Sequence, residues 1–144
     1  MGMFDAINSA ASGLSAERLR MDVISNNIAN VNTTRTAAGG AYRRQVVQFE
    51  PRAGQASFAQ ILSEQLESGQ GVRAVGITAD QSPLRNVYDP GHPDANAEGY
   101  VQMPNVNVVA EMVDMITATR AYEANVTSVN AAKNMAMQAL EIGK

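Results

Sequence analysis

Asp89, His92 and Asp94 are the residues whose types and spacing come closest to a chemical site in this sequence. They place two carboxylates and the chain's single imidazole within six residues, a set that could bind a metal ion or support hydrolysis. Hydrolysis would also need a nucleophile and a group that orients the imidazole, and the sequence nominates neither. Because the histidine stands between Gly91 and Pro93, the stretch is more typical of a shaped turn than of a reactive site.

A second candidate is the Gly-Gln-Gly stretch at 69–71, which half matches a dinucleotide-binding fingerprint. That fingerprint must follow a strand and open a helix, whereas this stretch is expected to follow a helix and open a strand. The 144 residues include no cysteine, which excludes thiol catalysis, disulfides and thiolate metal sites. We therefore expect no enzyme activity, no cofactor and no metal.

Charge and hydropathy exclude two classes of partner. The formal net charge of −3 gives no electrostatic reason to expect nucleic acid or an anionic membrane. No apolar run approaches the roughly 20 residues that span a bilayer, so we expect no direct membrane insertion. The N-terminus lacks the basic start and apolar block of a cleaved signal peptide.

Glycine and proline divide the chain into three parts. All five prolines and eight of the eleven glycines fall between positions 39 and 104. This distribution predicts an N-terminal helix with its stop in 1–35, a β-rich middle domain in 36–104 and a C-terminal helix in 105–144.

The middle part contains short β-branched or aromatic runs bounded by glycine or proline. Such runs predict strands at 42–50, 72–78 and 84–88. Apolar residues at helical spacing predict a short helix at 57–66, and a loop is expected at 90–99.

The C-terminal part carries an apolar seam with the alternating four- and three-residue spacing of a coiled coil. Asn107 is placed to cap this helix, with Glu111 in its first turn near the positive end of the helix dipole. Thr119 and Lys133 also occupy seam positions although they are polar. At 1.5 Å per residue the helix would be roughly 50 Å long, and it needs a partner along most of its length. The seam residues that we assign to a subunit interface are Val108, Met112, Met115, Tyr122, Val126, Val129 and Leu140.

Residues 3–31 repeat this pattern in the N-terminal part. The predicted fold is therefore α+β, with long N- and C-terminal α-helices paired as a coiled-coil-like bundle and a small β-rich domain between them. One seam against one partner helix buries little surface to offset the backbone entropy lost on folding, so we expect other subunits to complete the terminal helices. An ordinary amphipathic helix on a globular core is the alternative. The N-terminal seam residues assigned to the interface are Ile7, Leu14, Met21, Ile24 and Ile28.

The first predicted helix runs into a stretch dense in Asn and Thr at 26–36. These side chains compete with the helix backbone for hydrogen bonds, so the helix is expected to stop there. Ala29, Asn30 and Thr33, placed after an amphipathic helix, resemble the signature of the bacterial flagellar rod and hook proteins. Arg35 stands where the general family pattern, Ala-Asn-x-x-Thr-x-Gly, has its glycine.

The resemblance extends over 3–49 and 71–143. Within this family the sequence most resembles the proximal rod proteins. It implies a structural subunit of the flagellar basal-body proximal rod, which transmits torque from motor to hook by helix packing. The segments that carry it beyond the signature are 33–45, 82–85, 87–95, 98–101, 104–109, 111–116 and 118–125.

The same resemblance implies partners and location. The expected partners are further copies of this chain, the rod proteins FlgB, FlgF and FlgG, the adaptor FliE and the flagellar type III export apparatus. The expected location is the rod in the periplasmic space, reached without a cleaved signal peptide. The helices alone would also suit a soluble coiled-coil adaptor or export chaperone, although a middle part rich in proline and glycine counts against that alternative.

Overall fold

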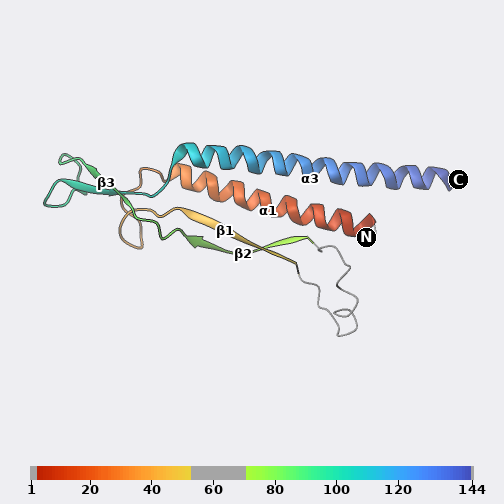
Figure 1. The fold of residues 1–144 in the computed structure, drawn as a ribbon, viewed down its shortest axis with the longest axis horizontal. Coiled ribbons are helices and arrows are strands. Elements are labelled where there is room, and N and C mark those ends of the chain that lie inside the picture. The colour runs from red at the N-terminus through yellow and green to blue at the C-terminus, as the bar shows by residue number, and fades with distance from the viewer. Residues whose placement is uncertain (1–2, 53–70, 144) are drawn as a thin grey trace, which may run out of the picture. The chain divides into compact units, whose positions relative to one another are not determined.

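The computed structural model describes residues 3–52 and 71–143. It contains two long helices and two small sheets, so the α+β prediction is confirmed. The short helix predicted at 57–66 lies outside the described residues. The elements in chain order are α1 (Met3–Ala29), β1 (Gln45–Pro51), β2 (Val72–Ala79), β3 (Arg85–Tyr88), β4 (Tyr100–Met103) and α3 (Val108–Ile142) (Figure 1).

Contacts group the chain into two compact units. Unit 1 comprises Met1–Leu19, Gln48–Gly76 and Ala118–Lys144, whereas unit 2 comprises Arg20–Val47 and Ile77–Thr117. Each unit therefore contains part of α1, part of the β1–β2 pair and part of α3. Segments far apart in the sequence fold together in both units.

The Asn- and Thr-rich stretch terminates α1 as the sequence predicts. Asn30 Nδ2 donates to the Asn26 carbonyl (2.9 Å), and Thr33 Oγ1 donates to Asn30 Oδ1 (3.1 Å). The Thr33 carbonyl in turn accepts a hydrogen bond from Tyr42 N (3.0 Å). The signature residues Asn30 and Thr33 thus form the turn by which the chain leaves the helix at Ala29.

At its start, α3 has the cap that the sequence predicts. Asn107 Oδ1 accepts hydrogen bonds from Val109 N (3.0 Å) and Ala110 N (3.4 Å). These bonds satisfy N–H groups that have no acceptor within the first turn of a helix. From this cap α3 continues for 35 residues to Ile142.

The strands β1 and β2 form a two-stranded sheet. In unit 1, Arg52 N donates to Gly71 O (2.9 Å), and in unit 2 Asp80 N donates to Arg44 O (2.7 Å). Residue numbers rise along one strand as they fall along the other, so the pair is antiparallel.

A second antiparallel sheet joins β3 to β4 in unit 2. Its register places Asn86 opposite Gln102 and Tyr88 opposite Tyr100. These four side chains share one face of the sheet because alternate residues of a strand point the same way, whereas the buried Val101 belongs to the other face. The four residues of β4 form too short an alternating pattern to predict a strand from the sequence.

Within each unit α1 contacts α3. In unit 1 a side chain at Gly13 would meet Asn125, because its Cβ would lie 2.8 Å from Asn125 Nδ2. In unit 2 Asn27 Nδ2 donates to Glu111 Oε2 (3.0 Å). The later residue of α1 meets the earlier residue of α3, so the helices run antiparallel.

The fully buried residues of α3 are not those of the predicted seam, and one half of that seam is largely exposed. Glu111, Ala118 and Ala132 are buried at heptad intervals, whereas Met112 and Leu140 of the predicted seam are exposed. Small alanine side chains allow another element to approach closely, so burial here follows size and pairing rather than hydrophobicity. The other half of the predicted seam, represented by Met115, Tyr122 and Val129, is half-buried.

The buried cores of both units are small. Few of the large apolar side chains among the described residues are fully buried, and many on α3 are exposed. The chain therefore does not cover its own apolar surface well, which is typical of a protein that buries this surface against partners. The buried apolar residues are Ala16, Ala118 and Ala132 in unit 1, and Val23, Ile24, Ala41, Val101 and Val106 in unit 2.

In unit 1 the start of β2 lies directly against α1. Val72 N donates to Ser12 Oγ (3.0 Å), and this hydroxyl donates to the Ser9 carbonyl (2.7 Å). Gly71 precedes this contact with φ +98°, and a Cβ there would overlap Ser12 Oγ and lie 3.2 Å from Ser9 Cα. Gly71 is therefore required both for its backbone conformation and for its lack of a side chain.

We expect Gly71→Ala to lower the free energy of unfolding by about 2–4 kcal/mol. The alanine would have to adopt the left-handed backbone conformation of Gly71, and its methyl group would overlap Ser12. Gly76→Ala is the matched control, because Gly76 also lies in this strand region but has an ordinary φ and open space around its Cβ position. Urea unfolding followed by circular dichroism measures both variants. Equal stability of the two variants would contradict the close contact between β2 and α1.

Candidate functional site

Each of the three side chains that suggested a metal or hydrolytic site has a hydrogen bond or ion pair of its own. Asp89 Oδ1 accepts from Gly91 N (3.2 Å), and His92 Nδ1 accepts from Asp94 N (3.1 Å). The Asp94 carboxylate pairs with the Arg35 guanidinium at 2.6 Å. These bonds describe a folded turn, and residues 3–52 and 71–143 contain no group of three His, Cys, Asp or Glu side chains arranged to hold a metal ion.

A buried polar cluster in unit 2 joins side chains from α1, from the segment ahead of β1 and from α3. We define it as the polar junction, made of Asn27 from α1, Tyr42 and Arg44 ahead of β1, and Glu111 from α3. Asn27 and Glu111 are each only 1% exposed. Buried polar groups at this depth require full hydrogen bonding, and the junction provides it.

Asn27 uses its whole carboxamide. Its Nδ2 donates to the Gln45 carbonyl (2.9 Å) and to Glu111 Oε2 (3.0 Å), while its Oδ1 accepts from Gln45 N (2.9 Å) and from Tyr42 Oη (2.9 Å). The bonds to Gln45 imitate those of a neighbouring strand, because one carboxamide meets both the N–H and the C=O of one residue. A helix side chain therefore holds the first residue of β1.

Arg44 connects the same region to the start of α3. Its Nε donates to Glu111 Oε1, and its NH2 donates to Asp114 Oδ2 (3.1 Å). Its backbone N–H donates to Asn105 Oδ1 (2.8 Å), just before the helix. Arginine suits this position because its fixed planar donors can bond several acceptors at once.

Asn105 and Asp80 extend these contacts to the turn after β2. Asn105 Nδ2 donates to the carbonyls of Asp80 and Ser82, both at 3.2 Å. Asp80 Oδ1 accepts from Ser82 Oγ (2.6 Å) and Ser82 N (2.8 Å), which closes the turn. The start of α3, β1 and the end of β2 are thus fastened together within unit 2.

Burial, charges and hydrogen bonds in and beside the junction shift the pKa values of Tyr42, Arg44 and Asp80. Burial raises the pKa of the Tyr42 phenol, and the negative charge of Glu111 raises it further. The hydrogen bond from Arg44 to Glu111 raises the pKa of Arg44. Hydrogen bonds from Ser82 lower the pKa of Asp80. At neutral pH the phenol is therefore neutral, the guanidinium is cationic and the Asp80 carboxylate is anionic.

The polar junction is not predicted from the sequence. Its pattern indicates only a dipole interaction for Glu111 and only a place in the helix stop for Asn27. One signal was present in the pattern: Glu111 stands seven residues before Ala118 and fourteen before Asn125, in register with the small and polar positions of α3. A charged residue in register with buried small residues is tolerated only with a partner, so this register marks Glu111 as a candidate for a buried pair.

The predicted interface residues of α1 lie on its less exposed side. Ile24 is buried, and Ile7, Leu14, Met21 and Ile28 are half-buried. The structure does not place them against another copy of the chain, so their role in an interface stays a prediction.

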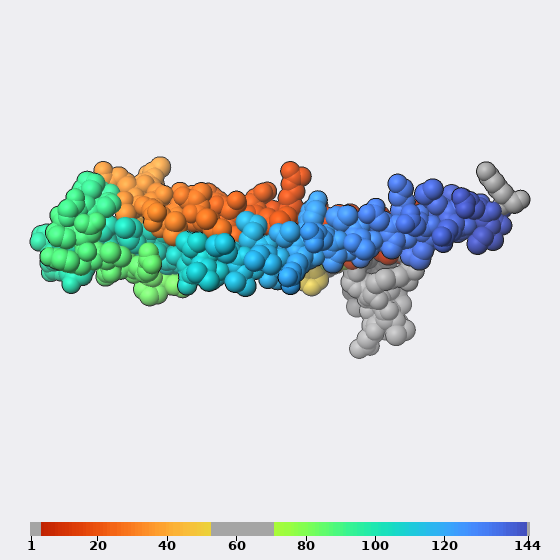
Figure 2. Space-filling view, turned by 90° about the horizontal axis from the view of Figure 1, so that it is seen from above, coloured from red at the N-terminus to blue at the C-terminus, as the bar shows by residue number. Residues whose placement is uncertain are grey.

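On α3 the predicted interface residues fall into two groups. Val108, Met112 and Leu140 are exposed, with Met112 at 55% and Leu140 at 73%. Other apolar side chains of α3 are exposed beside them, and Figure 2 shows much of this helix, in cyan to blue, open on the face turned to the viewer. The remaining predicted residues, Met115, Tyr122, Val126 and Val129, are half-buried.

An exposed apolar side of α3 does not mark a membrane span. Within the described residues, no helix combines the length and the apolar character that crossing a bilayer requires. Polar side chains such as Arg120, Glu123 and Lys133 interrupt the apolar positions. Exposed apolar side chains such as those of Val109 and Met112 suit contact with other proteins.

The two helical ends of the chain match known protein families. Residues 7–45, which hold most of α1 and the signature turn, match the family described as "Flagella basal body rod protein". Residues 97–142, which hold β4 and α3, match the family described as "Flagellar basal body rod FlgEFG protein C-terminal". The class is thus that of the flagellar basal-body rod proteins.

Full-length relatives narrow this class. The chain is 53% identical to the flagellar basal-body rod protein FlgC of Borreliella burgdorferi, over 99% of this chain and 98% of the relative. It is 49% identical to FlgC of Bacillus subtilis and 36% identical to FlgC of Salmonella typhimurium, each over the whole length of both chains. The chain belongs to the FlgC family of flagellar basal-body rod proteins.

We expect Asn27→Ala to lower the free energy of unfolding by about 1–3 kcal/mol, because the Gln45 main chain, the Tyr42 hydroxyl and one Glu111 oxygen lose the bonds that Asn27 makes to them. Hydrogen exchange should localise the effect, with the Gln45 amide exchanging about tenfold faster or more. Asn26→Ala is the matched control, since Asn26 is exposed and its side chain bonds only Asn30 nearby. Unchanged protection of the Gln45 amide in Asn27→Ala would contradict the assigned bonds.

The raised pKa of Tyr42 predicts a loss of stability in alkali. The unfolded chain loses the phenol proton near pH 10, while the folded chain retains it to higher pH. The stabilising contribution is therefore complete below about pH 10 and is lost as the pH rises through the folded pKa. In urea unfolding at pH 8–11.5, stability should fall more steeply for the unmodified chain than for Tyr42→Phe. Parallel curves would show that Tyr42 does not contribute.

Proposed function

We propose that this chain is a structural subunit of the proximal rod of the bacterial flagellar basal body, where it transmits torque from the motor to the hook. Membership of the FlgC family supports a structural rod protein and gives no reason to expect catalysis. The observation that carries the proposal is the length of α3 together with its exposed apolar side chains. Such a helix is completed by burial against neighbouring subunits.

The mechanism is packing, without a chemical step. We propose that α1 and α3 act as a coiled-coil-like pair and that neighbouring subunits cover the exposed side of α3. The antiparallel contacts at Gly13 and at Asn27 support close pairing of the helices. Torque would pass along these helices as a shear between subunits, and interlocked side chains resist shear because sliding would force close-packed, interdigitated side chains out of their positions.

The polar junction would contribute to this stiffness. It fixes the start of α3 through Glu111 and Arg44 and holds β1 to α1 through Asn27. A hydrogen bond needs defined directions, so it resists rotation of one element on another more strongly than apolar contact does. The start of β1 would then stay in a fixed orientation on the start of α3 within unit 2 while the helices bear the load.

We propose the partners that follow from this role. They are further copies of the chain, the rod proteins FlgB, FlgF and FlgG, and the adaptor FliE. The subunit would travel through the flagellar type III export apparatus without a cleaved signal peptide and would function in the periplasmic part of the rod. Membership of the family supports assembly into a rod with other rod proteins.

Charged substitutions on the exposed side of α3 test the proposed packing. We expect Met112→Asp and Leu140→Asp to fold normally, because both side chains are exposed, and to abolish rod assembly and swimming, because a charge would be buried between subunits. Met115→Asp and Val126→Asp should also block assembly. Asn130→Asp is the matched control, since it adds the same charge at an exposed polar position of α3.

The assay is swimming in soft agar by a strain that carries each variant as its only copy, with basal bodies inspected by electron microscopy. Circular dichroism of the purified variants separates folding from assembly. Normal swimming of Met112→Asp and Leu140→Asp would exclude this side of α3 as a subunit interface. Loss of swimming in Asn130→Asp as well would show that the assay detects charge alone.

A further inference from the structure

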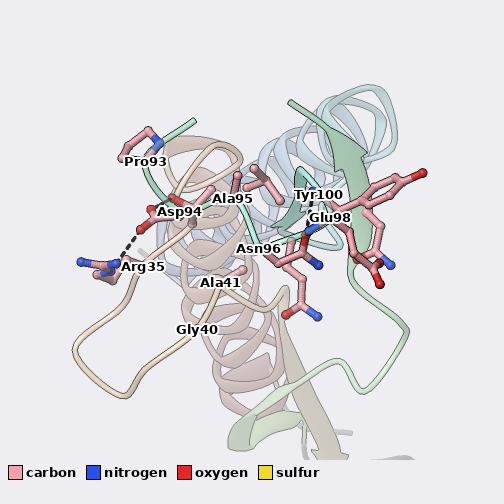
Figure 3. Close-up of a pocket in the computed structure, with 13 residues that line it drawn as sticks. Arg35, Gly40, Ala41, Pro93, Asp94, Ala95, Asn96, Glu98 and Tyr100 are labelled. Atoms are coloured by element: carbon pink, nitrogen blue, oxygen red, sulfur yellow. Dashed lines mark hydrogen bonds and ion pairs between the residues drawn. The ribbon is translucent and has the colours of Figure 1, made fainter. Parts of the chain in front are cut away.

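A hollow of about 680 Å³ lies beside β4 in unit 2, apart from the polar junction. Its lining comes from the turn after α1, from 93–98 and from both strands of the β3–β4 sheet. Figure 3 shows Arg35 and Asp94 on one wall and Asn96, Glu98 and Tyr100 on another. The rod function assigns no role to this hollow.

The charges of the hollow do not favour a charged ligand. Arg35 and Asp94 neutralise each other at 2.6 Å, and Thr34 Oγ1 donates to the second oxygen of Asp94 (2.8 Å). Of the lining residues, Glu98 alone adds a further charge. This carboxylate disfavours an anion, and the rest of the lining offers neutral polar groups that suit a neutral polar ligand.

Side-chain amides supply the polar groups. Asn96 Oδ1 accepts from Glu98 N (3.0 Å) and Tyr100 N (2.8 Å), which fixes its carboxamide and leaves Nδ2 in a set orientation to donate. Asn86 and Gln102 stand directly opposite each other in the β3–β4 register and are exposed. Within the part of the chain that the structure describes, no hydrogen bond of their side chains is found, so both carboxamides offer a donor and an acceptor.

An aromatic surface adjoins these amides. Tyr88 and Tyr100 share the face of Asn86 and Gln102, and their rings meet edge to face with centroids 5.3 Å apart. Tyr100 itself lines the hollow. A tyrosine ring combines apolar area with a hydroxyl, so it suits a ligand that has both C–H faces and hydroxyl groups.

The edge of β4 does not suit an added peptide strand. The outward N–H and C=O of Tyr100 are both bonded to Asn96, at 2.8 Å and 2.9 Å. Strand addition needs a row of free main-chain groups, and the four-residue β4 leaves only Gln102 facing outward. Recognition here must therefore rely on the side chains.

We propose that this hollow binds a neutral saccharide, with Asn86, Asn96 and Gln102 bonding its hydroxyl or acetamido groups and Tyr100 packing against a sugar ring. A sugar matches the lining because it is neutral, it donates and accepts hydrogen bonds in close alternation, and it has apolar C–H faces. An open site with few hydrogen bonds should bind with a Kd on the order of 1 mM. This proposal does not depend on the rod function.

The test is a titration of the full-length ¹⁵N-labelled chain with maltotriose and with triacetylchitotriose, followed by heteronuclear NMR. We expect the largest shifts at the Gln102 backbone amide and at the side-chain amides of Asn86, Asn96 and Gln102, for at least one of the two sugars. The double variant Asn86→Ala/Gln102→Ala should weaken binding at least tenfold. Gln138→Ala is the control, because Gln138 is an exposed glutamine of α3 outside the hollow, and it should bind like the unmodified chain.

Three results would overturn the proposal. The first is the absence of shifts with both sugars at 20-fold the expected Kd, that is at about 20 mM. The second is binding that the double variant leaves unchanged while its spectrum shows a folded chain. The third is that neither sugar shifts the resonances while a neutral extended tetrapeptide does, which would make the hollow a peptide site.

Discussion

The ion pair between Arg44 and Glu111 is the interaction on which the arrangement of unit 2 depends. Glu111 is 1% exposed, so its charge is tolerated only because Arg44 and Asn27 bond both of its oxygens. A buried charge without its partners would be far more costly than an apolar residue in the same place. The start of α3 is therefore held at one position on α1 and β1, where apolar contact alone would allow it to slide.

This constraint connects the local chemistry to the proposed role. A rod subunit must transmit force without slipping, and a buried polar pair defines a single register more strictly than a row of similar apolar side chains. Small residues bring the helices close together, as Gly13 does against Asn125. Large apolar residues such as Met112 are then left exposed on α3, available for other subunits.

Several features of the fold could be predicted from the sequence because their causes are local. The cap at Asn107 and the turn at Asn30 and Thr33 depend on side chains that bond backbone groups a few residues away. On α3 the hydrophobic pattern predicts that Met112 is buried, whereas the structure exposes Met112 and buries Glu111. A pattern of apolar residues does not reveal a charged residue that is buried with its partner.

The sequence by itself determined the helices, their ends and the family. Helical spacing and capping depend on residues that are close together in the chain, and the family signature is a short run of residues that can be recognised without any tertiary contact. Only the tertiary structure decided what Asn27, Arg44 and Glu111 do. Arg44 and Glu111 are 67 positions apart, and Asn27 and Glu111 are 84 apart. The tertiary structure likewise placed Asn86 and Gln102 side by side, through a register that β3 and β4 define together. Contacts of this kind depend on how distant segments pack, and a linear pattern of residue types does not encode that packing in any single stretch.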